Sequence, residues 1–187
     1  MRGIGLTREK VIEEAGKLAN ERGLSAVTIT NLANHLGIKK PSLYNHIKNQ
    51  DDIWNGIMSY GWEKVSKEIC AGIAIEDPKK ALTELSHGIY DYAMHNKGIF
   101  EAMLWYNSYE NEQLRSSTEG LYHFFLLQTD KLGIDRNLAN HLLRTYRSLL
   151  EGFILLVIHD SFGNPVSVEE SLQISIDFFI NGLEDMR

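Results

Sequence analysis

The sequence contains little cysteine and little proline, and each shortage narrows what the chain can be. Cys70 is the single cysteine among 187 residues, so neither an intramolecular disulfide nor a cysteine-cluster metal site is available. The three prolines leave long stretches in which helices can run uninterrupted. The opening residues lack the apolar run of a signal peptide, and the most apolar stretch, residues 153–158, is far shorter than the ~20 residues that span a bilayer. We therefore expect no membrane partner and a cytoplasmic location.

Motifs that depend on fixed glycine, serine or histidine spacings are also absent. The sequence has no G-x-S-x-G elbow, no H-E-x-x-H pair, no phosphate-binding loop and no dinucleotide glycine fingerprint. Its seven histidines do not fall into a metal-ligand cluster by spacing. We expect no metal, no cofactor and no catalytic activity. Catalysis is the first alternative function to weigh, and a screen for substrate turnover would test for it.

What is present is an uneven distribution of charge. Residues 1–50 carry eight Lys and Arg against four Asp and Glu, whereas residues 51–187 carry eleven against twenty-one. The net charge is therefore +4 in the first segment and −10 in the second. A basic end on an acidic body directs polyanions to one end of the molecule.

Apolar residues recur at helical spacing along most of the chain, which predicts an all-α fold of about nine helices. Three short helices are expected first: one from a cap at Thr7 to Arg22, one from a cap at Thr28 to Leu36, and one over residues 39–47. Longer helices are expected over residues 49–73, 77–96, 112–131, 135–161 and 167–183, with an aromatic-rich segment over residues 99–109. We assign residues 1–50 to a helix-turn-helix domain and residues 51–187 to a second, helical domain, which we call the body.

The strongest motif runs from Thr28 to Asp52 and reads T-I-T-N-L-A-N-H-L-G-I-K-K-P-S-L-Y-N-H-I-K-N-Q-D-D. Its spacings, together with the flanking residues 6–58, closely resemble the DNA-binding domain of TetR-family transcriptional regulators. The marks of the resemblance are Thr28, Leu32-Ala33, Gly37, Pro41-Ser42-Leu43-Tyr44, His46, Lys48 and the acidic start that follows. The resemblance implies a homodimer that binds operator DNA through a helix-turn-helix.

The residue types in this motif agree with that implication. Lys39 and Lys40 lie at the start of the predicted recognition helix, where donors meet base edges such as guanine O6 and N7. Small residues follow them and permit close approach, and the matching positions to Tyr44 and Lys48 contact phosphates in the family. The alternatives are that Tyr44 packs against the first helix and that the lysines and His46 are ordinary solvated residues. The predicted DNA-binding residues are Thr28, Thr30, Lys39, Lys40, Pro41, Ser42, Tyr44, Asn45, His46 and Lys48.

The second half resembles the WHG type of TetR C-terminal domain, through R-S-L-L-E-G-F at 147–153 and S-F-G-N-P at 161–165. That type usually carries Trp and His before the glycine, where this chain has Arg147 and Glu151. The resemblance implies an effector pocket in the body, and aromatic and polar residues supply candidates for it. Core packing is the alternative for each aromatic, and an internal ion pair is the alternative for Arg147 and Glu151. The candidates are His87, Tyr90, Met94, Phe100, Met103, Leu104, Trp105, Tyr106, Tyr109, Tyr122, Arg144, Arg147 and Glu151.

The last two predicted helices each carry an apolar seam, and two such helices from each protomer would form a four-helix bundle. The alternative is that the seams face only their own core. The predicted dimer-interface residues are Leu142, Leu149, Gly152, Phe153, Leu156, Leu172, Ile176, Phe179 and Leu183.

These observations predict a sequence-specific DNA-binding regulator, a repressor that an unknown small-molecule effector releases from its operator. The second competing function is a DNA-binding regulator controlled by a protein partner, with no small-molecule pocket. A closed body would favour that alternative, and a buried pocket with converging polar groups would count against it.

Overall fold

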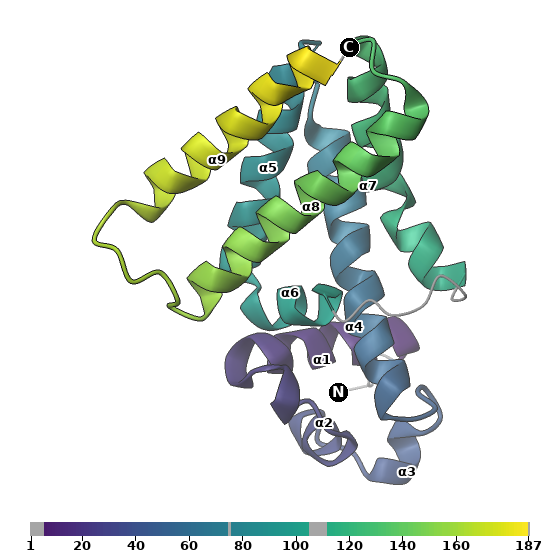
Figure 1. The fold of residues 1–187 in the computed structure, drawn as a ribbon. Helices are drawn as coiled ribbons and strands as arrows, with labels where there is room; N and C mark the ends of the chain where they lie inside the picture. Colours follow the sequence, from purple (N-terminus) through teal and green to yellow (C-terminus); the bar gives the residue numbers. More distant parts are fainter. Residues whose placement is uncertain (1–5, 75, 105–111, 187) are drawn as a thin grey trace. The chain divides into compact units, whose positions relative to one another are not determined.

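The computed structural model describes residues 6–74, 76–104 and 112–186, and helices are the regular elements of these ranges (Figure 1). Nine α-helices and no strand in this part of the chain confirm the all-α prediction. Packing divides the chain into two compact units, which we call the first and the second unit: Met1–Glu63 with Asn96–Ser117, and Lys64–His95 with Thr118–Arg187. These boundaries describe packing, so the functional division expected at residue 50 stays a prediction.

The first unit contains the helix-turn-helix. Its helices are α1 (Arg8–Arg22), α2 (Ile29–His35), α3 (Lys40–Leu43), α4 (Gln50–Lys64, whose last residue falls in the second unit) and α6 (Lys97–Leu104). The hydroxyls of Thr7 and Thr28 cap α1 and α2 as predicted, accepting hydrogen bonds from the amides of Lys10 and Asn31 at 3.3 and 3.2 Å. Gly37 makes the turn before α3 with φ of 65°, a conformation that a residue with a Cβ rarely adopts.

The predicted helix boundaries in the first half were confirmed in part, and the end of α3 was wrong. Helix α3 ends at Leu43 rather than Ile47, and residues 44–46 form a turn in which the amide of His46 donates to the carbonyl of Leu43 at 2.9 Å. The helix predicted over residues 49–73 is confirmed as a continuous helical run, in which α4 ends at Lys64 and Val65–Cys70 follows as a π-helical segment. The helix predicted over residues 77–96 ends at His95, and the next helix, α6, begins at Lys97 after a break at Asn96 alone.

The second unit continues from the π-helical segment through α5 (Pro78–His95), α7 (Glu112–Lys131), α8 (Arg136–Ile158) and α9 (Val168–Gly182) to a short 3₁₀ turn at Leu183–Met186. Residues of α7 from Thr118 onward belong to this unit. Helices α5, α8 and α9 pack against one another (Figure 1). The ring of the buried Tyr146 on α8 lies 5.3 Å from that of Phe125 on α7 and 5.4 Å from that of Phe179 on α9. Aromatic contacts therefore join three helices of the unit at one point.

The core of the second unit also corrects part of the dimer prediction. Five of the nine predicted interface side chains are buried within the unit, because each faces the neighbouring helices of its own chain: Leu142, Leu172, Ile176, Phe179 and Leu183. The other four, Leu149, Gly152, Phe153 and Leu156, are partly or largely exposed. On α9 the exposed apolar side chains are instead Ile174 and Phe178, at 62% and 81%. Their four-residue spacing places them on one helix face.

Candidate nucleic-acid interface

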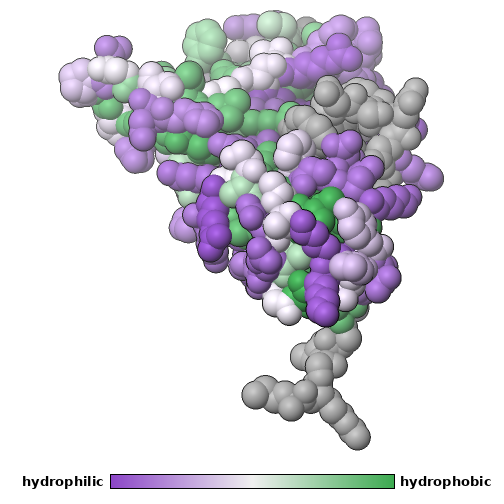
Figure 2. Space-filling model, turned by 90° about the horizontal axis from the view of Figure 1, so that it is seen from below, coloured by the Kyte–Doolittle hydropathy of each residue, from purple (hydrophilic) through white to green (hydrophobic). Residues whose placement is uncertain are grey.

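The segment around α3 presents its polar and cationic side chains to solvent. Lys39 precedes the helix in an extended conformation, and Lys40, Pro41 and Ser42 form its first turn, all exposed. Proline is tolerated in this first turn because its missing N–H would have no partner within the helix. Leu43 is fully buried and fixes the helix to the core of the first unit. Figure 2 views the side of this unit that carries α2 and α3, and hydrophilic residues cover most of it.

Tyr44 follows α3 with half of its surface exposed, at 51%. This exposure contradicts the alternative in which Tyr44 only packs against the first helix. Asn45 and Lys48 are also exposed, and His46 is partly buried. The predicted contact residues after α3 therefore lie on or near the surface that α3 presents.

At the start of α2, groups that a phosphate could contact already have hydrogen-bond partners within the protein. The Thr28 hydroxyl already accepts a hydrogen bond from Asn31, and the side-chain oxygen of Gln50 accepts one from the amide of Ile29 at 3.2 Å. The amides of Ile29 and Asn31 are thus engaged within the protein and are not available to a phosphate at this helix start. The exposed Thr30 hydroxyl is the better candidate for a phosphate contact at this end of α2.

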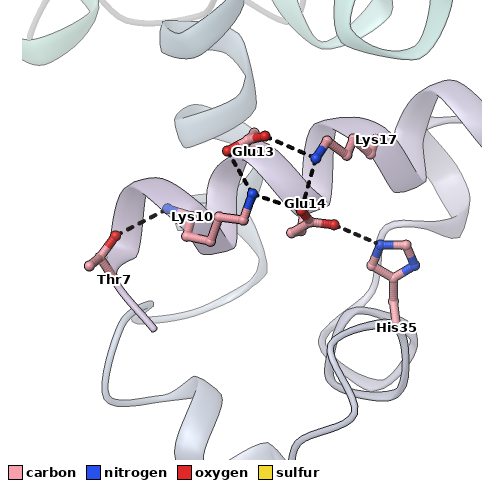
Figure 3. A network of polar contacts seen from close by, with 6 residues as sticks. All are labelled: Thr7, Lys10, Glu13, Glu14, Lys17 and His35. Carbon is pink, nitrogen blue, oxygen red and sulfur yellow. Dashed lines mark hydrogen bonds and ion pairs between the residues drawn. The ribbon is translucent and has the colours of Figure 1, made fainter. Parts of the chain in front are cut away.

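Cations on α1 are neutralised by a network of ion pairs (Figure 3). The Lys10 ammonium lies 3.0 and 3.1 Å from the carboxylates of Glu13 and Glu14, and the Lys17 ammonium lies 2.9 Å from each. The Nε2 atom of His35 on α2 lies 3.2 Å from Glu14. Hydrogen bonds from Lys17, and to a smaller degree from Lys10 and His35, lower the pKa of Glu14 to about 2.

By contrast, Lys39, Lys40 and Lys48 have no carboxylate partner within the described ranges. Three lysines without a carboxylate partner among the described residues therefore lie on and beside α3. Such cations attract phosphates and release the counterions of DNA when they bind.

The predicted pocket residues of the body have varied surroundings. The Nε2 atom of His87 on α5 lies 2.9 Å from the side-chain oxygen of Gln173 on α9, and Tyr90, Met94 and Tyr122 are partly buried. Phe100 and Met103 are fully buried in the first unit, so assigning them to a pocket in the body was wrong. Leu104 is partly buried in the first unit as well. Trp105, Tyr106 and Tyr109 lie outside the described residues.

Arg147 and Glu151 form the internal ion pair that was the alternative to a ligand clamp, with Nε and Oε1 2.6 Å apart. Burial raises the pKa of Glu151, and the neighbouring guanidinium acts against this shift. Arg144 is exposed. Arg147 and Glu151 therefore already form an ion pair with each other.

Sequence reasoning missed the most buried polar pair of the second unit. The hydroxyls of Ser86 on α5 and Tyr146 on α8 lie 2.9 Å apart, and Ser86 donates its own hydrogen to the carbonyl of Leu82 at 2.8 Å, so Tyr146 is the donor in the pair. Apolar side chains of α8 and α9 surround the pair and leave no room for a water molecule there. The available signal was Tyr146 itself, a hydroxyl four residues from both Leu142 and Leu150 on a buried helix face.

Two family models match the chain. The model for tetracycline repressor-like C-terminal domains matches residues 82–179, and that for bacterial regulatory proteins of the tetR family matches residues 11–55. The chain belongs to the TetR family.

Individual relatives agree with this assignment. An uncharacterized HTH-type transcriptional regulator of Bacillus subtilis, YobS, is 29% identical over 185 residues, which cover 96% of this chain and 94% of that protein. The class D tetracycline repressor of Escherichia coli is 49% identical over 45 residues, covering 24% of this chain and 21% of the repressor. The crystal structure of a TetR variant from Acinetobacter baumannii in complex with minocycline has a TM-score of 0.76 and 20% identity, covering 98% of this chain and 99% of that one.

This TetR-family protein is a DNA-binding transcriptional regulator, and the helix-turn-helix of its first unit is the DNA-binding element. Within the described ranges no helix is long and apolar enough to cross a membrane.

Proposed function

We propose that this TetR-family regulator is a homodimeric repressor that a small-molecule effector releases from its operator. The observation that carries the proposal is the group of exposed, uncompensated lysines, Lys39, Lys40 and Lys48, on and beside α3. In this proposal Lys39 and Lys40 meet base edges, and Tyr44, His46 and Lys48 contact phosphates, with Thr30 beside them. Pro41, Ser42, Asn45 and Thr28 border these contacts.

Exposed apolar residues of α8 and α9 support the proposed dimer. Ile174 and Phe178 extend the four interface residues that remain available, Leu149, Gly152, Phe153 and Leu156. Exposed phenylalanine on a regular helix marks an interaction surface, because water contact with the ring is unfavourable. A dimer also gives a mechanistic advantage, since two recognition segments about 34–36 Å apart read two half-sites of a palindrome.

The course of the chain supports effector control. The chain passes between the two units after Glu63, before Asn96 and after Ser117, so three covalent connections link the effector-binding body to the unit that contains α3. A ligand that binds one arrangement of the body more tightly shifts the population of the arrangement that binds DNA. The related structure with minocycline supplies a precedent for a ligand in this fold.

The test begins with duplexes selected by the wild-type protein from a random DNA library. Their affinity is then measured by fluorescence anisotropy with and without compounds that raise the melting temperature of the protein. We expect at least one stabilising compound to weaken operator binding. Equal affinity with and without a bound compound contradicts effector release while leaving DNA binding intact.

Dimerisation needs its own measurement. Sedimentation analysis is expected to show a dimer for the wild-type protein and a monomer for Phe178→Asp, which places a charge on the exposed face of α9. Asp177→Asn, a neighbouring exposed position, serves as the control and is expected to remain dimeric. A dimeric Phe178→Asp variant contradicts an interface at this face.

The close packing around Ser86 and Tyr146 favours a second candidate, control by a protein partner rather than by a small molecule. In that case no compound alters operator affinity, and a partner protein from the same cell does.

A further inference from the structure

Arg8, the first residue of α1, is joined to the segment that follows α3. Its guanidinium donates two hydrogen bonds to the carboxylate of Asp52 on α4, at 3.0 and 2.8 Å, and one to the backbone carbonyl of His46 at 3.2 Å. The same carboxylate accepts a hydrogen bond from the backbone amide of Lys48 at 2.7 Å. The two side chains are 33% and 19% exposed, so water screens this pair only in part.

These contacts hold a backbone that no helix holds. Residues 44–49 connect α3 to α4, and within them the carbonyl of His46 accepts from Arg8 and the amide of Lys48 donates to Asp52. A bidentate guanidinium–carboxylate pair fixes orientation as well as distance, because its two hydrogen bonds are parallel. The pair therefore fixes the direction in which the side chains of His46 and Lys48 leave the surface.

The charge of Asp52 sharpens this interpretation. A carboxylate beside a DNA-facing segment repels phosphates. If charge alone matters, a regulator that loses this carboxylate binds DNA more tightly. The start of α4 has its own cap, because the side-chain oxygen of Asn49 accepts a hydrogen bond from the backbone amide of Asp52 at 2.9 Å. Arg8 cancels the charge of Asp52 at short range and leaves its oxygen atoms available to the backbone of Lys48.

We infer that Arg8 and Asp52 are positioning residues for DNA binding, which hold the His46–Lys48 backbone in the geometry that the duplex requires without contacting DNA themselves. The inference rests on the proposed DNA contacts of His46 and Lys48. It separates positioning from two simpler roles, a direct phosphate contact by Arg8 and an electrostatic effect of the two charges.

Asp52→Asn is the decisive variant. If charge alone matters, removing a negative charge tightens DNA binding; if the pair positions the backbone, binding weakens about tenfold, the loss of one hydrogen bond to a charged group. Arg8→Gln is expected to weaken binding by a similar factor. The double variant is expected to have the same affinity as whichever single variant binds DNA less tightly, because both changes break the same group of hydrogen bonds.

The measurement is anisotropy on a duplex selected by the wild-type protein, at several salt concentrations. For a positioning role Arg8→Gln and Asp52→Asn change the slope of log affinity against log salt concentration alike, because both act through the same segment, whereas a direct phosphate contact by Arg8 lowers the slope by about one unit in Arg8→Gln alone. Lys10→Gln is the matched control, since it removes a cation from the same helix that pairs with Glu13 and Glu14 instead. We expect its affinity to stay within about twofold of wild type.

Amide hydrogen exchange gives a readout that does not depend on DNA. In Asp52→Asn and Arg8→Gln the amide of Lys48 is expected to exchange faster, while amides of α2 keep wild-type protection. If Arg8→Gln does not fold, Arg8→Lys retains the charge without the planar fork and is expected to bind DNA more weakly than wild type, as Asp52→Asn does.

Wild-type or tighter binding by Asp52→Asn overturns the inference, as does a salt slope that falls by about one unit in Arg8→Gln but stays at the wild-type value in Asp52→Asn. Failure of the underlying contacts is distinguishable, because Lys48→Ala then leaves both affinity and salt slope at the wild-type value.

Discussion

A Cβ atom on Gly98 would lie 2.1 Å from the carbonyl oxygen of Ala19, which is backbone and cannot rotate away. The start of α6 thus packs directly on the end of α1. Asn20 completes the contact: its side-chain oxygen accepts from the amide of Ile99 at 3.1 Å, and its nitrogen donates to the side-chain oxygen of Asn96 at 3.0 Å. Helix α6, which lies far from α1 in the sequence, is in this way part of the first unit.

Gly98→Ala is expected to lower the free energy of unfolding by about 1–3 kcal/mol or more, because α6 must move off α1 to admit the methyl group. Gly72→Ala is the control: it is exposed at the end of the helical stretch that follows the π-helical segment, with nothing within 4 Å of its Cβ position, and alanine there is expected to stabilise the helix by about 0.5–1 kcal/mol. Urea denaturation measures both. Equal stability of Gly98→Ala and wild type contradicts the tight contact.

Lys40→Ala is expected to weaken operator binding by about 1–3 kcal/mol and to relax base preference, because Lys40 is exposed in the first turn of α3 where a donor meets a guanine edge. The check is to repeat the selection from random duplexes with the variant. An unchanged preferred sequence assigns Lys40 no role in base recognition.

Lys48→Ala is expected to weaken binding to all duplexes alike, since a phosphate contact carries no base information. The slope of log affinity against log salt concentration should fall by about one unit. Titrations with the selected duplex and with a scrambled duplex measure both effects. A wild-type slope removes Lys48 from the phosphate contacts.

Acid is expected to destabilise the first unit through Glu14. Its pKa lies at about 2 in the folded protein against an ordinary 4.5, so the ionised carboxylate stabilises the fold above about pH 4.5. That contribution is lost as the pH falls from 4.5 towards 2. Urea denaturation between pH 7 and pH 3 should therefore show a shallower loss of stability in Glu14→Gln than in wild type. Glu21→Gln, an exposed position on the same helix, should follow the wild-type curve.

Cys70 is expected to be unreactive in the folded protein. The thiol is 7% exposed, and burial raises its pKa from 9.0 to about 11, which lowers the thiolate fraction at pH 8 about 100-fold. A disulfide reagent such as Ellman's should therefore react at least that much more slowly in buffer than in concentrated urea. Comparable rates in the two conditions would place the thiol at the surface.

Much of the local structure was predictable because its hydrogen bonds span only a few residues. Thr7, Thr28, Asp135 and Ser167 each accept a hydrogen bond from an amide two or three positions later, as their sequence contexts predict. The glycine turn at Gly37 follows from backbone sterics alone. The motif around this turn was also enough to indicate the TetR family.

The errors arose where distant residues supply the partners. The helical spacing of Leu43 and Ile47 predicted one helix over residues 39–47. Both side chains are indeed buried. The chain turns after Leu43 instead. Arg8 donates a hydrogen bond to the carbonyl of His46 in this turn, although the two residues are 38 positions apart in the sequence. No periodicity reports a partner at that separation.

The amino-acid sequence by itself determined where most helices begin and which end of the chain meets DNA, because caps, turns and charge are local properties. Only the tertiary structure decided that α6 belongs with α1, that Tyr146 joins Phe125 and Phe179 in one core, and that α9 presents Ile174 and Phe178 rather than Ile176 and Phe179 to solvent. An amphipathic helix has a definite apolar stripe, but which neighbour covers it depends on close packing between segments far apart in the chain.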